Sequence, residues 1–185
     1  EDEFGNFGED RYTYFVKSVP KRILLSLSKN EFLPKEEVNA KTQVVDQTGN
    51  EITKDKDVTI KVYNPNKEVI TEWKNELNYD LDEYAMPGRY IIDAQLDSLT
   101  EEQPFDVKPV ELLEISLINE SLLLFNKGNV VYNKPLEIVF NGVQERRFIE
   151  EVNLKPGESE EYKLNDKLTA GTYTITVLSG DNAYK

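Results

Sequence analysis

The chain has 185 residues and contains no cysteine and no histidine. A Ser-His-Asp triad, a thiol nucleophile and a His/Cys zinc site therefore cannot form within it. With 22 Lys and Arg against 35 Asp and Glu, the net charge is −13, which repels phosphate backbones and excludes nucleic acid as an expected partner. No run of about 18 apolar residues exists, so we expect membrane attachment only through an anchor outside this chain.

The first 19 residues differ in character from the rest of the chain. Residues 1–10 are acidic and carry too little apolar surface to fold alone. Residues 11–17 are aromatic and β-branched, and Pro20 interrupts the run. We interpret residues 1–19 as an acidic N-terminal tail or an extra edge strand.

Residues 20–108 show the pattern of a β-sandwich. Apolar and polar residues alternate with a period of two from Val38 to Val44, from Val58 to Val62 and from Tyr90 to Leu96. Turn residues such as Thr48-Gly49-Asn50 separate these runs. About seven short strands at this spacing predict an immunoglobulin-like sandwich.

Residues 109–185 repeat the pattern after a very short junction at residues 109–111. Apolar strands are expected at residues 112–118 and 122–125, and Asn141-Gly142 is a two-residue hairpin signal. No stretch shows a sustained helical period. The predicted fold is therefore all-β, with two tandem immunoglobulin-like sandwiches at 20–108 and 109–185.

An internal repeat supports this division. Tyr79 and Tyr90 are separated by 11 residues, as are Tyr162 and Tyr173, and the two copies are offset by 83 (162 − 79). In each copy a glycine, Gly88 or Gly171, lies two residues before the second tyrosine. We expect Tyr90 and Tyr173 to form tyrosine corners, in which the ring packs in the core and the hydroxyl bonds nearby backbone.

The second half carries an Asn-x-Gly-Asn turn at residues 126–129, the run Leu-Lys-Pro-Gly-Glu-Ser at 154–159 and Ala-Gly-Thr-Tyr at 170–173. With these motifs it resembles the CARDB family of cell-adhesion-related sandwich modules. The first half is similar to bacterial immunoglobulin-like or macroglobulin-type domains. The resemblance implies modules that space or present other elements on secreted and membrane-anchored proteins, with no catalytic residues.

Few residues suggest binding chemistry. Asp80, Asp82 and Glu83 could supply oxygen ligands to calcium, but a solvated acidic edge also explains them, and the second repeat has Lys163 and Asn165 at the equivalent positions. Trp73 and Tyr63, with Tyr12 and Tyr14, could form a platform for sugar rings, or pack in the core. Asn119 begins a glycosylation sequon. A pair of carboxylates could in principle hydrolyse glycosides, but no acidic pair has an apolar setting that would raise a pKa.

We therefore expect no enzymatic activity and no cofactor. The predicted function is an extracellular spacer or adhesion module of a prokaryotic, possibly archaeal, cell-surface or membrane-anchored protein, whose partner is a protein or another surface component. The alternatives are a carbohydrate- or calcium-binding module and an accessory domain of a larger secreted enzyme. The first residue is Glu1 and no apolar signal region comes after it, so we expect a processed or truncated piece.

Overall fold

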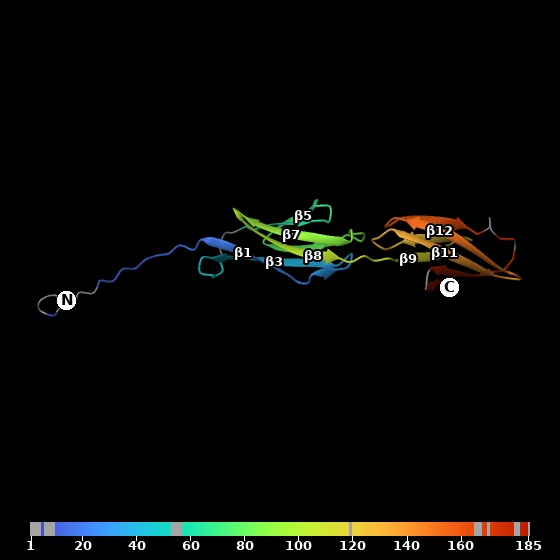
Figure 1. Ribbon diagram of the computed structural model, residues 1–185, viewed down its shortest axis with the longest axis horizontal. Coiled ribbons are helices and arrows are strands. Elements are labelled where there is room, and N and C mark those ends of the chain that lie inside the picture. Colours follow the sequence, from blue (N-terminus) through green and yellow to red (C-terminus); the bar gives the residue numbers. More distant parts are fainter. Residues whose placement is uncertain are drawn as a thin grey trace.

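The computed structural model describes residue 5 and residues 10–52, 57–118, 120–164, 168–169, 171–179 and 182–184. All its regular elements are strands, and within these ranges no helix is long and apolar enough to cross a membrane. The strands form two β-sandwiches arranged end to end along the longest axis (Figure 1). The predicted fold class, all-β with tandem immunoglobulin-like sandwiches, is confirmed.

The first sandwich packs two sheets in the orders β1-β3-β6 and β2-β8-β7-β4-β5. Their strands pair antiparallel except for β2 and β8, which are parallel. Within the described ranges its strands are β1 (Pro20–Leu27), β2 (Glu31–Phe32), β3 (Glu37–Asp46), β4 (Thr59–Tyr63), β5 (Val69–Lys74), β6 (Glu76–Asp80), β7 (Gly88–Leu96) and β8 (Leu99–Val107).

The core of this sandwich follows from the alternation along its strands. Val38 and Ala40 in β3, Ile60 and Val62 in β4, and Ile92 in β7 are each at most 1% exposed. The residues between them face outward, because successive side chains of a strand point to opposite faces. Phe105 stacks on Tyr90 with ring centroids 5.1 Å apart, which closes the core near the end of β8.

The second sandwich packs sheets in the orders β13-β10-β9 and β12-β11-β14-β15. Its described strands are β9 (Leu113–Ile118), β10 (Ser121–Asn126), β11 (Tyr132–Asn141), β12 (Glu145–Leu154), β13 (Ser159–Lys163), β14 (Thr174–Ser179) and β15 (Asn182–Tyr184). A separate apolar cluster fills it, including Leu124, Leu136 and Phe140, each at most 1% exposed.

Of the two interpretations of residues 1–19, a tail or an extra edge strand, the edge strand is not formed at residues 11–17. The chain there is extended but pairs with neither sheet, and Tyr12, Tyr14, Phe15 and Val16 are 74%, 82%, 93% and 74% exposed. The physical reason is that β1 begins only at Pro20, whose missing N–H and fixed φ separate it from the preceding run. The two-residue strand β2 was not predicted, because its pairing with β8 is parallel and joins residues 75 positions apart (106 − 31).

Candidate functional site: the junction between the sandwiches

The short linker between the sandwiches is bonded along its length to the first turn of the second sandwich. The Asn129 amide N–H donates to the Val110 carbonyl oxygen at 3.0 Å, and that of Lys127 donates to the Leu112 oxygen at 2.8 Å. On the other side, the Lys108 N–H donates to the Phe32 oxygen at 2.9 Å. The backbone of the linker is therefore held by both domains.

The side chain of Asn129 joins the two sandwiches directly. Its Nδ2 donates to the carbonyl oxygen of Ala85 at 2.8 Å and to that of Lys108 at 3.1 Å, while its Oδ1 accepts the Val110 N–H at 2.6 Å. Both amide protons and the amide oxygen are thus used. Because Asn129 is only 4% exposed, losing these bonds would leave buried polar groups without partners.

Asn126 and Gly128 shape the turn that presents Asn129. The fully buried Asn126 side chain donates from Nδ2 to the Val130 and Leu154 oxygens at 2.8 and 2.9 Å, and its Oδ1 accepts the Gly128 N–H at 2.9 Å. A Cβ on Gly128 would collide with the Val110 carbonyl oxygen. The linker approaches so closely that only glycine fits there.

The opposite half of the junction is the loop of residues 82–87 in the first sandwich. Asp82 Oδ1 accepts the Tyr84 N–H at 2.7 Å, and the Ala85 N–H donates to the Asp82 carbonyl at 3.1 Å. The Tyr90 hydroxyl donates to the Met86 oxygen at 3.0 Å. These bonds fix the Ala85 carbonyl where Asn129 meets it.

The Tyr84 ring forms a second contact across the junction. A Cβ on Gly157 would lie 3.1 Å from this ring, so the glycine backbone and the ring are in close approach. Gly157 has φ of +76°, a left-handed conformation that other residues rarely adopt. An aromatic ring against a backbone plane adds apolar area that the Asn129 bonds alone do not provide.

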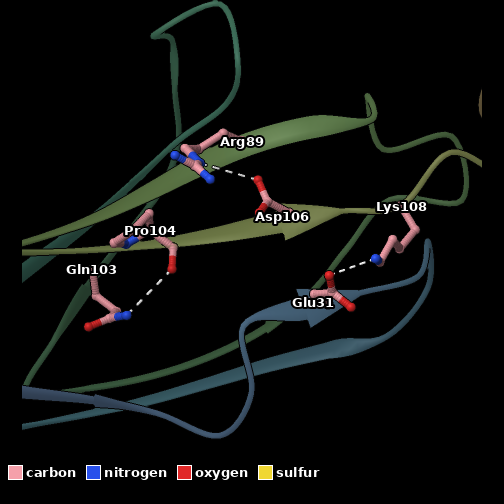
Figure 2. Close-up of polar contacts among 6 residues, drawn as sticks. All are labelled: Glu31, Arg89, Gln103, Pro104, Asp106 and Lys108. Atoms are coloured by element: carbon pink, nitrogen blue, oxygen red, sulfur yellow. Dashed lines mark hydrogen bonds and ion pairs between the residues drawn. The ribbon is translucent and has the colours of Figure 1, made fainter.

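Ion pairs brace the end of β8, from which the linker emerges (Figure 2). Lys108 Nζ lies 2.6 Å from Glu31 Oε1 of β2, and Arg89 Nε of β7 lies 3.3 Å from Asp106 Oδ1 of β8. These exposed pairs contribute little stability, but they tie β8 to both neighbouring strands. Beside the linker, a shallow cavity of about 270 Å³ is lined by Leu33, Pro34, Lys35, Glu83, Val110, Leu112 and Lys127.

Two of the three candidate calcium ligands make other contacts near this junction. Asp80 lies at the end of β6 in register with Glu37, Asp82 caps the loop turn, and Glu83 Oε1 lies 2.5 Å from Lys35 Nζ. Among the described residues, no group of three or more carboxylates could hold a metal ion. Calcium binding by these residues stays a prediction, with two of them already engaged.

The predicted aromatic platform is not assembled. Trp73 lies opposite Ile60 and therefore on the inner side of its sheet at the β5 edge, whereas Tyr63 alternates with buried Val62 and faces outward. Trp73 is 39% exposed and donates from Nε1 to Thr71 Oγ1 at 2.8 Å. Tyr12 and Tyr14 lie before β1, in neither sheet. Asn119 of the sequon lies outside the described residues.

The second repeated tyrosine makes the same bond as the first. The Tyr173 hydroxyl donates to the Thr169 carbonyl at 3.1 Å, four residues upstream, as Tyr90 does to Met86. A Cβ on Gly171 would lie 3.3 Å from the Tyr173 ring, and Gly88 has φ of +129°. Gly171 thus packs against the ring of its own corner, whereas a Cβ on Gly88 would meet Pro65 at 3.3 Å. The first corner also supports the junction.

Sequence reasoning noted the Asn-x-Gly-Asn motif but not the role of Asn129. Its partners are backbone oxygens 44 and 21 residues away, and backbone groups have no sequence signature. Two features of the sequence could have indicated this role: two asparagines around a glycine, and a linker of only three residues. A linker this short leaves little room between the domains.

Comparisons with known proteins do not assign the chain to a family. No family model matches the chain, and no curated protein matches it. The CARDB resemblance of the second half is therefore not supported by either comparison.

Similar solved structures exist at low identity. The chain resembles α2-macroglobulin from Salmonella (16% identity, TM-score 0.45, covering 89% of this chain and 14% of that one) and from Escherichia coli (12%, 0.45, 87% and 15%). It also resembles a tetra-tandem repeat in the extending region of a large adhesion protein (11%, 0.43, 88% and 46%). This chain spans less than half of each of these proteins, and similarity at this level carries no argument about function.

Proposed function

We propose that this chain is a non-enzymatic spacer whose two sandwiches are held at a fixed distance and orientation by the Asn129 junction. The observation that carries the proposal is the double engagement of one buried side chain, which bonds the linker and the neighbouring domain at once. A spacer needs such a joint, because a flexible linker would let the domains move independently.

The surface chemistry supports the same role. A net charge of −13 keeps the two sandwiches soluble and opposes association between copies of the chain. We place the module outside a prokaryotic cell, in a cell-surface or membrane-anchored protein, with a protein or another surface component as its partner. We also propose that the second half of the chain is related to CARDB modules.

A distance measurement between two spin labels tests the spacer. Because the chain has no cysteine, Glu101→Cys near the start of β8 and Val143→Cys in the β11–β12 hairpin give two labels on separate domains. We expect a single narrow distance distribution that broadens in Asn129→Ala. Asn153→Ala, an exposed asparagine of β12, is the matched control and should leave the distribution narrow. A broad distribution in the parent chain would contradict the proposal.

The alternative of a ligand-binding module is tested separately by thermal shift. A ligand at 100 times its dissociation constant stabilises a protein by about 2.7 kcal/mol. We expect no shift with calcium or with a glycan panel, because Asp82 and Glu83 are engaged and the aromatic residues do not share a face. A calcium-dependent shift that disappears in Asp80→Asn would favour the alternative.

A further inference from the structure

The segment before β1 is built like the end of the first sandwich and its junction. Residues 16–19 read Val-Lys-Ser-Val, and residues 107–110 read Val-Lys-Pro-Val, an offset of 91 (107 − 16). At the same offset Tyr12, Tyr14 and Val16 correspond to Gln103, Phe105 and Val107, which point into the first sandwich from β8. The segment therefore has the apolar alternation of a last strand, and its junction matches the other at three of four residues, with Ser18 in place of Pro109.

Residues 17–19 are held by one side-chain amide, as the linker at residues 108–110 is held by Asn129; we call this arrangement an amide clamp. Gln47 Nε2 donates to the Lys17 carbonyl at 3.2 Å, and Gln47 Oε1 accepts the Val19 N–H at 2.8 Å. Asn129 makes this pair of bonds to Lys108 and Val110 at 3.1 and 2.6 Å. Each amide thus spans residues i and i+2 of a Val-Lys-x-Val linker.

The two clamps lie in corresponding turns of their domains, Gln47 one residue after its strand and Asn129 three residues after its strand. Gln47 follows β3, which pairs with the first strand β1, and Asn129 follows β10, which pairs with the first strand β9. Asp46 and Asn126, each the last residue of its strand and each buried, accept a backbone N–H two residues on, from Thr48 at 2.8 Å and Gly128 at 2.9 Å. The first sandwich is therefore equipped to receive a domain at its outer end.

The segment itself has no partner sheet within the described part of the chain. It runs away from the first sandwich on the side opposite the second (Figure 1), with its aromatic side chains exposed. Tyr14 is 82% exposed, whereas its counterpart Phe105 is 1% exposed. Residues 11–17 also carry two basic and no acidic side chains in a chain of net charge −13, which suits a strand that enters an acidic domain of the same kind.

From these equivalences we infer that residues 11–17 are the last strand of a further β-sandwich, seated on the first one through the Gln47 clamp. The partner that covers Tyr12, Tyr14 and Val16 is thus a sandwich with an apolar groove where its own last strand is missing. The inference adds one domain to the spacer. That this added domain lengthens a spacer rests on the proposed function.

Hydrogen exchange at residues 12–16 tests this inference. The chain 1–185 is compared with the natural protein that includes about 100 residues encoded upstream, roughly one domain. We expect the exchange of these amides to slow by about 100-fold or more in the longer protein, toward that of Phe105 and Val107, since paired core strands open rarely. Equal exchange in both proteins, or an upstream sequence without strand periodicity, would overturn the inference.

One further outcome distinguishes an upstream sandwich from a second copy of this chain. Protection that arises in chain 1–185 and grows with its concentration would assign the segment to a second copy and refute the upstream sandwich. The test does not depend on the stiffness of the Asn129 junction, so the inference and the spacer function fail separately.

A strand exchange within the first sandwich checks the register. Replacing residues 103–107 by residues 12–16 puts Tyr14 and Val16 at the buried positions of Phe105 and Val107, and we expect a cooperative transition within a few degrees of the parent. The matched control uses residues 11–15, which shifts the register by one and places Thr13 at the Phe105 position. Equal melting temperatures for the two exchanges would contradict the inference.

Discussion

Asn129 of the second sandwich donates to the carbonyl oxygen of Ala85 in the first at 2.8 Å, while its own oxygen accepts the N–H of Val110 in the linker between them. One side chain thus fixes the linker and the facing domain together. Since Ala85 lies in the loop held by the Tyr90 corner, the junction depends on a structural feature of each sandwich.

Asn129→Asp separates the two halves of this clamp. The carboxylate retains an acceptor for Val110 but loses both donations and faces two carbonyl oxygens. We expect a loss of about 1–3 kcal/mol in unfolding free energy at neutral pH, the cost of leaving buried polar groups unpaired. Burial beside carbonyls disfavours the charged form and raises the pKa of this carboxyl in the folded state above its unfolded value of about 3.9, so the penalty relative to the parent should shrink as pH falls toward about 4 and stay constant below it. Denaturant titrations at both pH values, with Asn153→Asp as control, measure it; a pH-independent penalty would argue against this geometry.

Gly128→Ala is expected to destabilise by steric conflict alone, because its φ is not in the left-handed region and the added Cβ meets the Val110 oxygen. We expect a cost of about 3 kcal/mol, at the upper end for overpacking. Gly49→Ala is the matched control: nothing lies within 4 Å of its Cβ, but its φ is +87°, so only backbone strain of about 1 kcal/mol applies. Chemical denaturation of both variants gives the comparison, and equal losses would exclude the close approach at Gly128.

The sequence predicted strands well where one face is buried, because alternation such as Val38 to Val44 records the packing directly. It also placed Tyr90 and Tyr173 in corners, since a glycine turn before a strand constrains the local chain. It left residues 11–17 open between a tail and an extra edge strand, because a β-rich composition does not specify a partner. Nor did it reveal the clamp of Asn129, whose partners are backbone atoms of distant residues.

Tyr90→Phe and Tyr173→Phe should differ although the two hydroxyls make the same bond. Tyr90 is 3% exposed, so losing its bond to Met86 should cost about 1 kcal/mol or more, whereas the more exposed Tyr173 bond should cost less. Trp73, the single tryptophan, lies in the first sandwich, so its fluorescence reports that domain. We expect only Tyr90→Phe to lower the midpoint of the fluorescence transition. A shift of that midpoint in Tyr173→Phe would mean that the sandwiches unfold as one unit.

Tyr162 in β13 is expected to make the stability of the second sandwich depend on pH in the alkaline range. Burial, followed by the nearby carboxylates of Glu160 and Glu150, raises its pKa from 10.0 to about 12. The folded state therefore favours the neutral phenol more than the unfolded state does. This stabilisation is complete below pH 10 and is lost as pH rises from about 10 to about 12.

We accordingly expect the melting temperature of the second sandwich, followed by circular dichroism, to fall across that window, and Tyr162→Phe to flatten the fall. Tyr12→Phe, at an exposed tyrosine outside both sheets, is the control. Because a phenylalanine at position 162 cannot ionise, an equally steep fall in Tyr162→Phe would show that another group drives alkaline unfolding.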